Sequence, residues 1–500
     1  MMIALALVLS LSVLSLDEAA AEDGAADQAE TQQQQGEEDN KKEKKSRKEK
    51  KNKKNKKDQK EDEQPAVADR PNVLFISVDD LNDFPAFMQR YPDAKTPHMD
   101  RLAKRGLVFT NAHCQFPLCG PSRASVMSGL LPSTLGYVHH MKDRQLQQRS
   151  RELGTELIHS YFASHGYKTM AVGKICHSHV PQGSVDQSGG RGSFHGGTGK
   201  LKRNWTQEGT STDWAAAPDK DEQLPDHKAA TWAVDRLGEK HDKPFFLMLG
   251  LLRPHVPWYV PKPWFDLYDK KTLSLPPYRQ NDLDDVPKMA KEISILPQMP
   301  RTEWATKNDQ WRNILHAYLA CISFSDHQVG RVLKALEKSP YRDNTIIVLW
   351  SDHGYHMGEK NTFQKHSLWE RSTHVPLVIA GPGAKPGVRC ERVVSLIDLY
   401  PTLLEMCGLP QNKKNEGRSL VPLMQDPKQP WPYPAIVGWK HGSFAIQDEQ
   451  YRYIRYSDGS EELYDSVKDP NEWTNLAGKP ELDGIKRRLA ESIPSNQNGD

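Results

Sequence analysis

The 500-residue chain is poor in cysteine and carries little net charge. Its six cysteines are too few for a scaffold built on disulfides, although one or two bridges are the default expectation for an exported protein. No run of about 18 apolar residues follows the N-terminus, which excludes an internal membrane span. No heptad or Gly-X-Y period is sustained, so coiled coil and collagen are excluded as well.

The remaining composition is that of a globular protein. Hydrophobic residues make up 37%, charged residues 26% and aromatic residues 8% of the chain. The 33 glycines and 35 prolines favour long loops over a helical bundle. At about 150 residues per domain, this length predicts two to four domains.

The net charge of +2 conceals two N-terminal blocks of opposite sign. Residues 17–39 hold nine acidic residues and no basic one, while residues 41–60 hold thirteen Lys or Arg against three acids. Without residues 1–65, the chain has 54 basic and 50 acidic residues, a body of +4. Because a body that binds nucleic acid usually carries a dense basic face, no nucleic-acid partner is expected.

The N-terminus is typical of a targeting segment. An apolar stretch over residues 1–16 and an Ala-rich cleavage site ending at Ala21 predict a signal peptide over residues 1–21. Residues 22–65 have almost no apolar content, so we expect a disordered tail, acidic and then Lys-rich. The Lys block 41–57 could bind an anionic polymer, but a solvated spacer is the simpler interpretation. We expect a secreted, periplasmic or cell-surface protein with no transmembrane segment after the signal.

From Arg70 onward, apolar β-branched runs alternate with helical patterns. Four runs suit strands buried on both faces and end abruptly in polar residues; they cover 73–78, 169–172, 245–252 and 345–350. Helical patterns lie between them, as at 226–239 and 310–338. This alternation predicts an α/β fold with a mostly parallel sheet flanked by helices.

The pattern changes after Pro410. Short strands joined by turns are predicted at 435–439, 443–447, 451–456 and 461–464. We therefore expect a main domain over residues 66–424 and a small C-terminal α+β subdomain with an antiparallel sheet over residues 425–500.

The four predicted strands deliver polar side chains to one edge of the sheet, where ligands of such sheets bind. These residues are Asp79, Asp80, Lys174, His177, His255, Asp352 and His353. Adjacent carboxylates repel one another unless a cation or hydrogen-bond donors compensate. The two aspartates, with Asp352 and His353, form an oxygen-rich set that suits calcium or magnesium better than zinc.

The segment that starts at Cys119 places a nucleophile beside an anion site. Pro121 at a first helical position predicts a helix that starts just after Cys119. The side chain of residue 119 then lies at the helix N-terminus, which favours an anion, and Arg123 follows one turn later. The alternative for a secreted cysteine is a disulfide.

This segment resembles the signature of the formylglycine-dependent type I sulfatases of the alkaline-phosphatase superfamily, in which the Cys of C-x-P-x-R is oxidised to formylglycine. Cys119, Pro121 and Arg123 match that core. The strand-end motifs follow in family order, ending with Lys365, and the resemblance covers about residues 70–475. The segments RPHVPW, SDHGYHMGEK and FQKHSLWERSTHVPL resemble the iduronate 2-sulfatase subgroup.

The resemblance implies an exported sulfatase that hydrolyses sulfate esters of a sulfated sugar or polysaccharide, with residues 66–424 as its alkaline-phosphatase-like catalytic domain. It implies a calcium ion, with magnesium less favoured, held by Asp79, Asp80, Cys119 as formylglycine, Asp352 and His353. The implied catalytic residues are Cys119, Arg123, Lys174, His177, His255 and Lys365. His255 would protonate the leaving oxygen and His177 would take a proton, although these two roles could be exchanged. A formylglycine-generating enzyme or an anaerobic sulfatase-maturating enzyme is the implied partner.

Two other functions remain as alternatives. A relative in the same superfamily could hydrolyse phosphate or phosphonate esters, and a non-catalytic protein could bind glycans through its Lys-rich tail. The intact C-x-P-x-R motif and a ligand set for a single metal weigh against the first. The second predicts degraded catalytic motifs, and none is degraded.

Overall fold

A computed structural model describes residues 69–193 and 202–495 of the chain. The signal peptide predicted over residues 1–21 and the tail predicted over residues 22–65 lie outside the described residues. Pro65–Asp500 form one compact unit.

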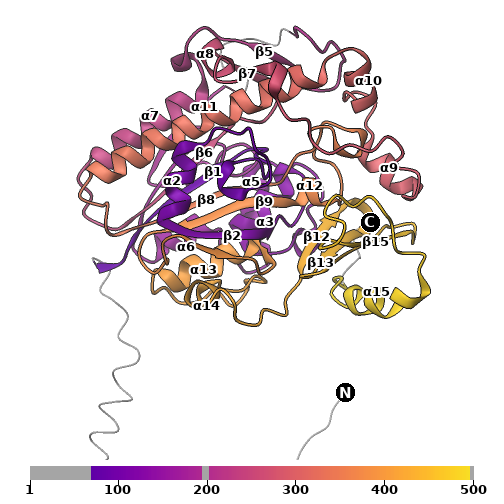
Figure 1. Ribbon diagram of the computed structural model, residues 1–500. Helices are drawn as coiled ribbons and strands as arrows, with labels where there is room; N and C mark the ends of the chain where they lie inside the picture. The colour runs from indigo at the N-terminus through magenta and orange to yellow at the C-terminus, as the bar shows by residue number, and fades with distance from the viewer. Residues whose placement is uncertain (1–68, 194–201, 496–500) are drawn as a thin grey trace, which may run out of the picture. The chain divides into compact units, whose positions relative to one another are not determined.

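A nine-stranded, mostly parallel sheet lies at the centre (Figure 1). Its order is β10-β2-β9-β8-β1-β6-β3-β4, with β11 paired to β2. The strands are β1 (Asn72–Val78), β2 (Gly106–His113), β3 (Lys168–Gly173), β4 (Gln187–Gly190), β6 (Phe245–Leu251), β8 (Thr345–Ser351), β9 (His374–Ala380), β10 (Val388–Cys390) and β11 (Val394–Ser395). Among the described pairings of this sheet, only those of β9 with β2 and β8 are antiparallel. The predicted fold class is confirmed.

The four predicted strands are β1, β3, β6 and β8, and each is bounded within about one residue of its prediction. They are adjacent in the sheet as β8-β1-β6-β3, and all three pairings are parallel. Every residue of β1, β6 and β8 is buried, as expected for strands covered on both faces.

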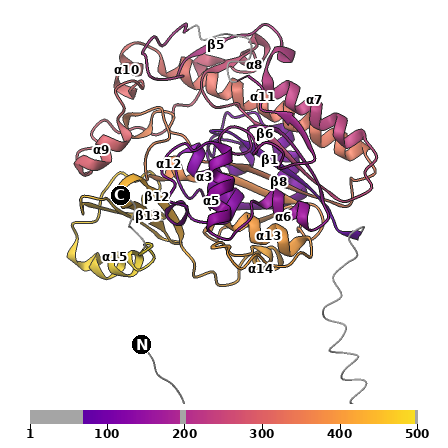
Figure 2. The ribbon, with the colours of Figure 1, turned by 180° about the vertical axis from the view of Figure 1, so that it is seen from behind.

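Helices cover both faces of the sheet. Leu74 and Ile76 of β1 pack into the core formed with α2 (Pro97–Arg105), α7 (Pro225–Gly238) and α11 (Trp311–Lys338). Val73 and Phe75, which point the other way, pack into a second core. That core is formed with α3 (Cys119–Ser128), α5 (Asp143–Glu152), α6 (Ile158–Ser164), α13 (Leu399–Met406) and α14 (Val421–Gln425). Accordingly, α2 lies in front of the sheet in Figure 1 and α3, α5 and α6 lie in front of it in Figure 2.

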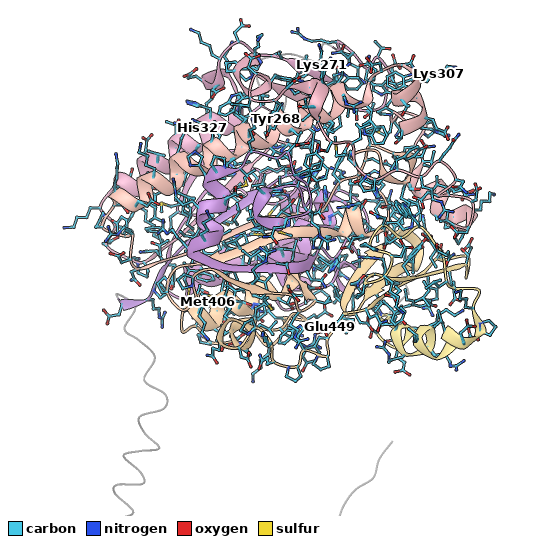
Figure 3. All side chains as sticks on the ribbon, in the orientation of Figure 1. Tyr268, Lys271, Lys307, His327, Met406 and Glu449 are labelled. Carbon is cyan, nitrogen blue, oxygen red and sulfur yellow. The ribbon has the colours of Figure 1, made fainter. Side chains whose placement is uncertain are left out.

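The remaining elements surround this core. The short helices are α4 (Pro132–Leu135), α8 (Lys262–Phe265), α9 (Lys288–Ser294), α10 (Thr302–Lys307) and α12 (Glu370–Thr373), and β5 (Trp214–Ala216) pairs with β7 (Trp258–Val260). Tyr268, labelled in Figure 3, follows α8 and shares a 2.6 Å hydrogen bond with Ser323 of α11. No helix within residues 69–193 and 202–495 is long and apolar enough to cross a bilayer.

The C-terminal strands form a separate antiparallel sheet, as predicted. It consists of β12 (Ala435–Trp439), β13 (Ser443–Gln447), β14 (Tyr451–Arg455) and β15 (Glu461–Asp465). One face packs with α15 (Asp483–Ala490), through residues such as Phe444 and Leu489. The other face packs against the main body, where Val437 and Ile454 share a core with Phe116 and Trp369.

The expectation of one or two disulfides is wrong for this structure. All six cysteines lie in the described residues, and each is buried and unpaired. Five of them pack as small apolar residues in the two cores, and Cys119 lies at the start of α3.

Candidate active site

The polar residues predicted to gather at one edge of the sheet do so. Strands β8, β1, β6 and β3 are parallel neighbours, so the residues that follow them meet at their carboxyl ends. The antiparallel strand β9 starts at this same edge, and the segment before it carries Lys365. The helix α3 begins there as well, on the segment that follows β2.

Cys119 lies at the centre of this group. Its Sγ atom is 3.0 Å from Nζ of Lys365, 3.2 Å from Nε2 of His353 and 3.8 Å from Oδ1 of Asp80. The helix begins at Cys119 itself, with Leu118 as N-cap, so Pro121 is its third residue and not its first as predicted. The predicted location of residue 119 at a helix N-terminus is confirmed.

Arg123 joins the elements around Cys119. Its side chain is fully buried. Its Nε donates to Oδ2 of Asp352 at 2.8 Å, and its Nη2 lies 3.2 Å from Oδ1 of Asp79. Its Nη1 donates to the carbonyl of Lys174 at 2.7 Å. One guanidinium therefore orients two carboxylates and the turn after β3, using the fixed fork of donors that lysine lacks.

Lys174 reaches the site because two strands approach closely beside it. Gly173 has φ +82°, and a Cβ there would lie 1.9 Å from the carbonyl oxygen of Gly250, so a side chain is excluded. The chain then turns, and Nζ of Lys174 lies 2.6 Å from Oδ2 of Asp79.

The buried charges strongly perturb one another. Burial alone would raise the pKa of Asp79, but nearby positive charges, led by Lys174, hold it well below its usual value. Burial raises the pKa of Asp80, and Lys365 offsets this only in part. Burial also raises the pKa of the Cys119 thiol to about 12, so an unmodified thiol here would be a poor nucleophile at neutral pH.

The acidic residues could hold a metal ion. Ligand atoms of Asp79, Asp80, Cys119 and His255 lie within 4.8 Å of one another, as do those of Cys119, Asp352 and His353. Oδ2 of Asp80 is buried and accepts no hydrogen bond from any described residue, and Nε2 of His255 lies 3.9 Å from it. A buried carboxylate oxygen aimed into a cluster of other ligands suits a hard divalent cation.

The two predicted catalytic histidines lie in different surroundings. Nδ1 of His255 donates to the carbonyl of Val256 at 2.7 Å, which turns Nε2 toward Asp80. His177 stacks on His140, with ring centroids 3.8 Å apart. The sequence patterns did not indicate His140, because it lies in a loop with no motif of its own.

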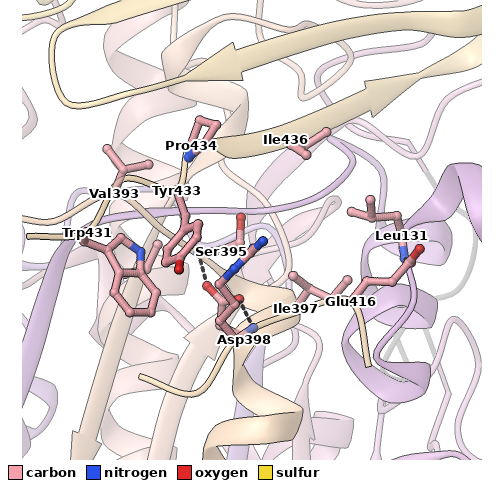
Figure 4. Close-up of a pocket in the computed structure, with 12 residues that line it drawn as sticks. Leu131, Val393, Ser395, Ile397, Asp398, Glu416, Trp431, Tyr433, Pro434 and Ile436 are labelled. Carbon is pink, nitrogen blue, oxygen red and sulfur yellow. Dashed lines mark hydrogen bonds between the residues drawn. The ribbon is translucent and has the colours of Figure 1, made fainter. Parts of the chain in front are cut away.

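Two other histidines near these motifs and one cavity away from them have structural roles. His356 shares a 2.9 Å hydrogen bond with Ser367, and Nδ1 of His374 lies 3.1 Å from Oδ2 of Asp83. A small cavity elsewhere contains none of the predicted site residues (Figure 4). Its Asp398 accepts backbone hydrogen bonds from Ser395 at 2.9 Å and Arg418 at 2.8 Å, and so fixes a loop.

The fold brings two buried lysines, an acidic cluster and a cysteine at a helix N-terminus together at one edge of a mostly parallel sheet. A family model described as Sulfatase matches residues 71–409, and the chain belongs to the sulfatase family, whose members are sulfuric ester hydrolases. A second model, described as N-sulphoglucosamine sulphohydrolase, C-terminal, matches residues 358–499.

Several curated proteins and solved structures are similar. A sulfatase of Formosa agariphila is 45% identical over 441 residues, covering 85% of this chain and 87% of that protein. Human iduronate 2-sulfatase is 30% identical over 396 residues, covering 69% and 70%. The structure of BT4656 in complex with its substrate D-glucosamine-2-N,6-O-disulfate has a TM-score of 0.67 at 21% identity, covering 85% of this chain and 97% of that one. A phosphonate monoester hydrolase of Agrobacterium radiobacter has the same TM-score at 23% identity, covering 86% and 95%, so these two structures establish only the shared fold.

Proposed function

We propose that this protein is an exported sulfatase that removes sulfate from a sulfated saccharide, with a formylglycine made from Cys119 and a bound calcium ion. One observation carries the proposal. Cys119 lies at a helix N-terminus within 4 Å of Lys365, His353 and Asp80. Anion-binding charges and candidate metal ligands thus surround the residue that the family modifies.

Asp79, Asp80, Asp352, His353 and residue 119 would hold the calcium ion. Carboxylate oxygens dominate this set, which favours calcium or magnesium over zinc, and the adaptable geometry of calcium favours it over magnesium. When bound, the ion would polarise a sulfate oxygen and offset charge in the transition state.

The formylglycine requires a maturating enzyme as partner. The Cys119 side chain would lose its sulfur and two hydrogens and gain one oxygen, so that CH2SH becomes CHO. The carbon is oxidised, and the maturating enzyme must supply the oxidant. Water then adds to the aldehyde and gives two hydroxyl groups, one to attack sulfur and one to expel sulfate afterwards.

The remaining residues would each serve one step. Lys174 and Lys365 would neutralise sulfate oxygens as charge builds on them. Arg123 would hold residue 119 and two carboxylates in place. His255, whose Nε2 faces the cluster, would give a proton to the leaving oxygen.

His177 would take the proton of the second hydroxyl, so that sulfate leaves and the aldehyde returns. The roles of His255 and His177 can be exchanged on present geometry. In the absence of substrate, burial and the charge of Lys365 hold the pKa of His255 well below its usual value. A bound sulfate ester would bring negative charge beside the ring and favour the protonated form that an acid needs.

The relatives support a saccharide as substrate. The names of the similar proteins include iduronate 2-sulfatase and, from Formosa agariphila at 29% identity, an ulvan-active sulfatase. We therefore propose the sulfate ester of a sugar or polysaccharide, as in the iduronate 2-sulfatase subgroup. The signal peptide predicted over residues 1–21 supports export to where such polymers occur.

The test is peptide mass spectrometry across residue 119 of the protein exported by its native host. Conversion makes this peptide about 18 Da lighter. We further expect the converted protein to hydrolyse 4-nitrophenyl sulfate or a sulfated saccharide. The Cys119→Ala variant should hydrolyse neither. A residue 119 found only as thiol or disulfide contradicts the mechanism, and preferred turnover of a phosphonate monoester such as 4-nitrophenyl phenylphosphonate would favour the phosphonate alternative.

A further inference from the structure

His140 and His177 form a stacked pair of rings, and the proposed catalytic roles involve only His177. The two rings are nearly parallel, with planes 11° apart and centroids 3.8 Å apart. His140 is on the segment between α4 and α5, whereas His177 follows β3. His140 remains partly exposed to solvent and His177 is half-buried. The pair is therefore in part open to solvent.

The two segments that carry these rings are tied to each other. Asp143, the first residue of α5, accepts hydrogen bonds from the backbone amides of Ser178 at 3.2 Å and His179 at 2.8 Å. On the His140 side, the backbone amide of Met141 donates to the hydroxyl of Tyr137 at 2.6 Å, and the Tyr137 ring is buried. The stack is thus a braced contact between two loops.

His140 also packs directly against the residue after the nucleophile. A Cβ added at Gly120 would lie 2.7 Å from Nδ1 of His140, closer than side-chain atoms tolerate. The glycine at this position therefore leaves the space that the ring occupies. His140 therefore spans from the backbone beside Cys119 to the ring of His177.

The charges around the pair keep both rings neutral at neutral pH. Burial, then Lys365 and Lys174, lower the pKa of His140 to about 4, with Asp79 and His353 also facing it. Burial and the charge of Lys174 also lower the pKa of His177, to about 3. Two neutral imidazoles can stack without the repulsion that two imidazolium ions would suffer.

We propose that His140 is a positioning residue that holds the ring of His177 in place for proton transfer, with Gly120 providing the space for it. This inference rests on the proposed function, in which His177 acts on the hydroxyl of residue 119. A ring fixed by stacking loses no freedom when the reaction begins, whereas an unsupported ring would sample unproductive orientations.

Three variants test the inference by kinetics on 4-nitrophenyl sulfate. We expect His140→Ala to lower kcat about tenfold with a smaller change in KM, because proton transfer is affected more than sulfate binding. His140→Phe keeps a stacking ring and should recover most of kcat. His139→Ala removes the neighbouring exposed imidazole and should match the wild type. Formylglycine content is measured for each variant, so that incomplete conversion is not mistaken for slow chemistry.

Gly120→Ala provides an independent test of the geometry. The added methyl group must displace the ring of His140, so Gly120→Ala alone should lower kcat. Introduced into the His140→Ala variant, the same change should lower kcat little further. Additive losses in the double variant would overturn the packing argument.

NMR titration of His177 tests the same contact without substrate. In His140→Ala the ring of His177 gains solvent, so its pKa should rise, while His140→Phe should keep it low. Arg191, Lys174 and Asp79 also face His177 and are unchanged in both variants. The inference is overturned if His140→Ala matches the wild type in kcat and in this titration. Lack of formylglycine in the wild type counts instead against the proposed function.

Discussion

Nζ of Lys365 lies 3.0 Å from Sγ of Cys119 and 2.7 Å from Oδ1 of Asp80, although Lys365 is 246 residues from Cys119 along the chain. The ammonium group therefore connects the proposed formylglycine position with a candidate metal ligand. The location of this ammonium group also suits a role in binding a sulfate oxygen.

Replacing Lys365 with methionine should lower kcat on a sulfate ester about 100-fold or more. The loss of one preorganised donor to developing charge has a cost of this size in other enzymes. Steady-state kinetics on 4-nitrophenyl sulfate check the prediction. Lys271→Met is the matched control, since Lys271 is an exposed lysine in the turn Lys270–Thr272, which carries none of the site residues (Figure 3). A Lys365→Met enzyme within threefold of the control would contradict the role of this lysine.

Removal of bound metal should abolish turnover. We expect EGTA treatment to inactivate the enzyme, and calcium to restore more activity than magnesium at equal concentration. Calcium should also raise the melting temperature, because it binds the folded carboxylate cluster and not the unfolded chain. Asp80→Asn should lose this shift, while Asp343→Asn at the surface should retain it. Full activity after EGTA, or restoration by magnesium alone, would argue against calcium.

His159 should make the fold sensitive to acid. Its ring is fully buried on α6, Nε2 lies 3.0 Å from the Ser184 hydroxyl, and Nδ1 has no hydrogen-bond partner among the described residues. Burial, with a smaller contribution from His179, lowers the pKa of His159 to about 3. The unfolded chain binds this proton near its ordinary pKa of about 6.5, so stability is lost as the pH falls below that value.

The expected loss from His159 is about 2 kcal/mol between pH 7.5 and pH 5. His159→Gln cannot ionise, so its unfolding free energy should fall less over this range than that of the wild type. Denaturant unfolding at the two pH values measures the difference, with the exposed His139→Gln as control. If the unfolding free energies of the wild type and of His159→Gln fell by the same amount, the His159 ring would not contribute to the acid sensitivity.

The main architecture could be predicted from sequence because it depends on burial. The run that became β1 is apolar throughout and ends at Asp79, so both its strand and its location in the sheet could be inferred. Lys365 has no such local signal and was indicated only by resemblance to the family. His140 was missed because its importance comes from long-range contact with His177 and Gly120. The disulfide expectation failed because it rested on compartment, whereas all six cysteines are buried and unpaired in the structure.

The reversed direction of β9 has a consequence for how this site can change. Because β8 and β9 form an antiparallel pair, residues 352–373 leave the reactive edge and return to it without crossing the molecule. One continuous connection, which ends in α12, therefore carries Asp352 and His353 at its start and Lys365 further along. Its two anchors lie in neighbouring strands, and residues 352–365 are buried, so a change of length between the anchors would disturb the packing around both of them. Changes in substrate preference are therefore expected to arise in other segments, whose length can vary without displacing the candidate metal ligands.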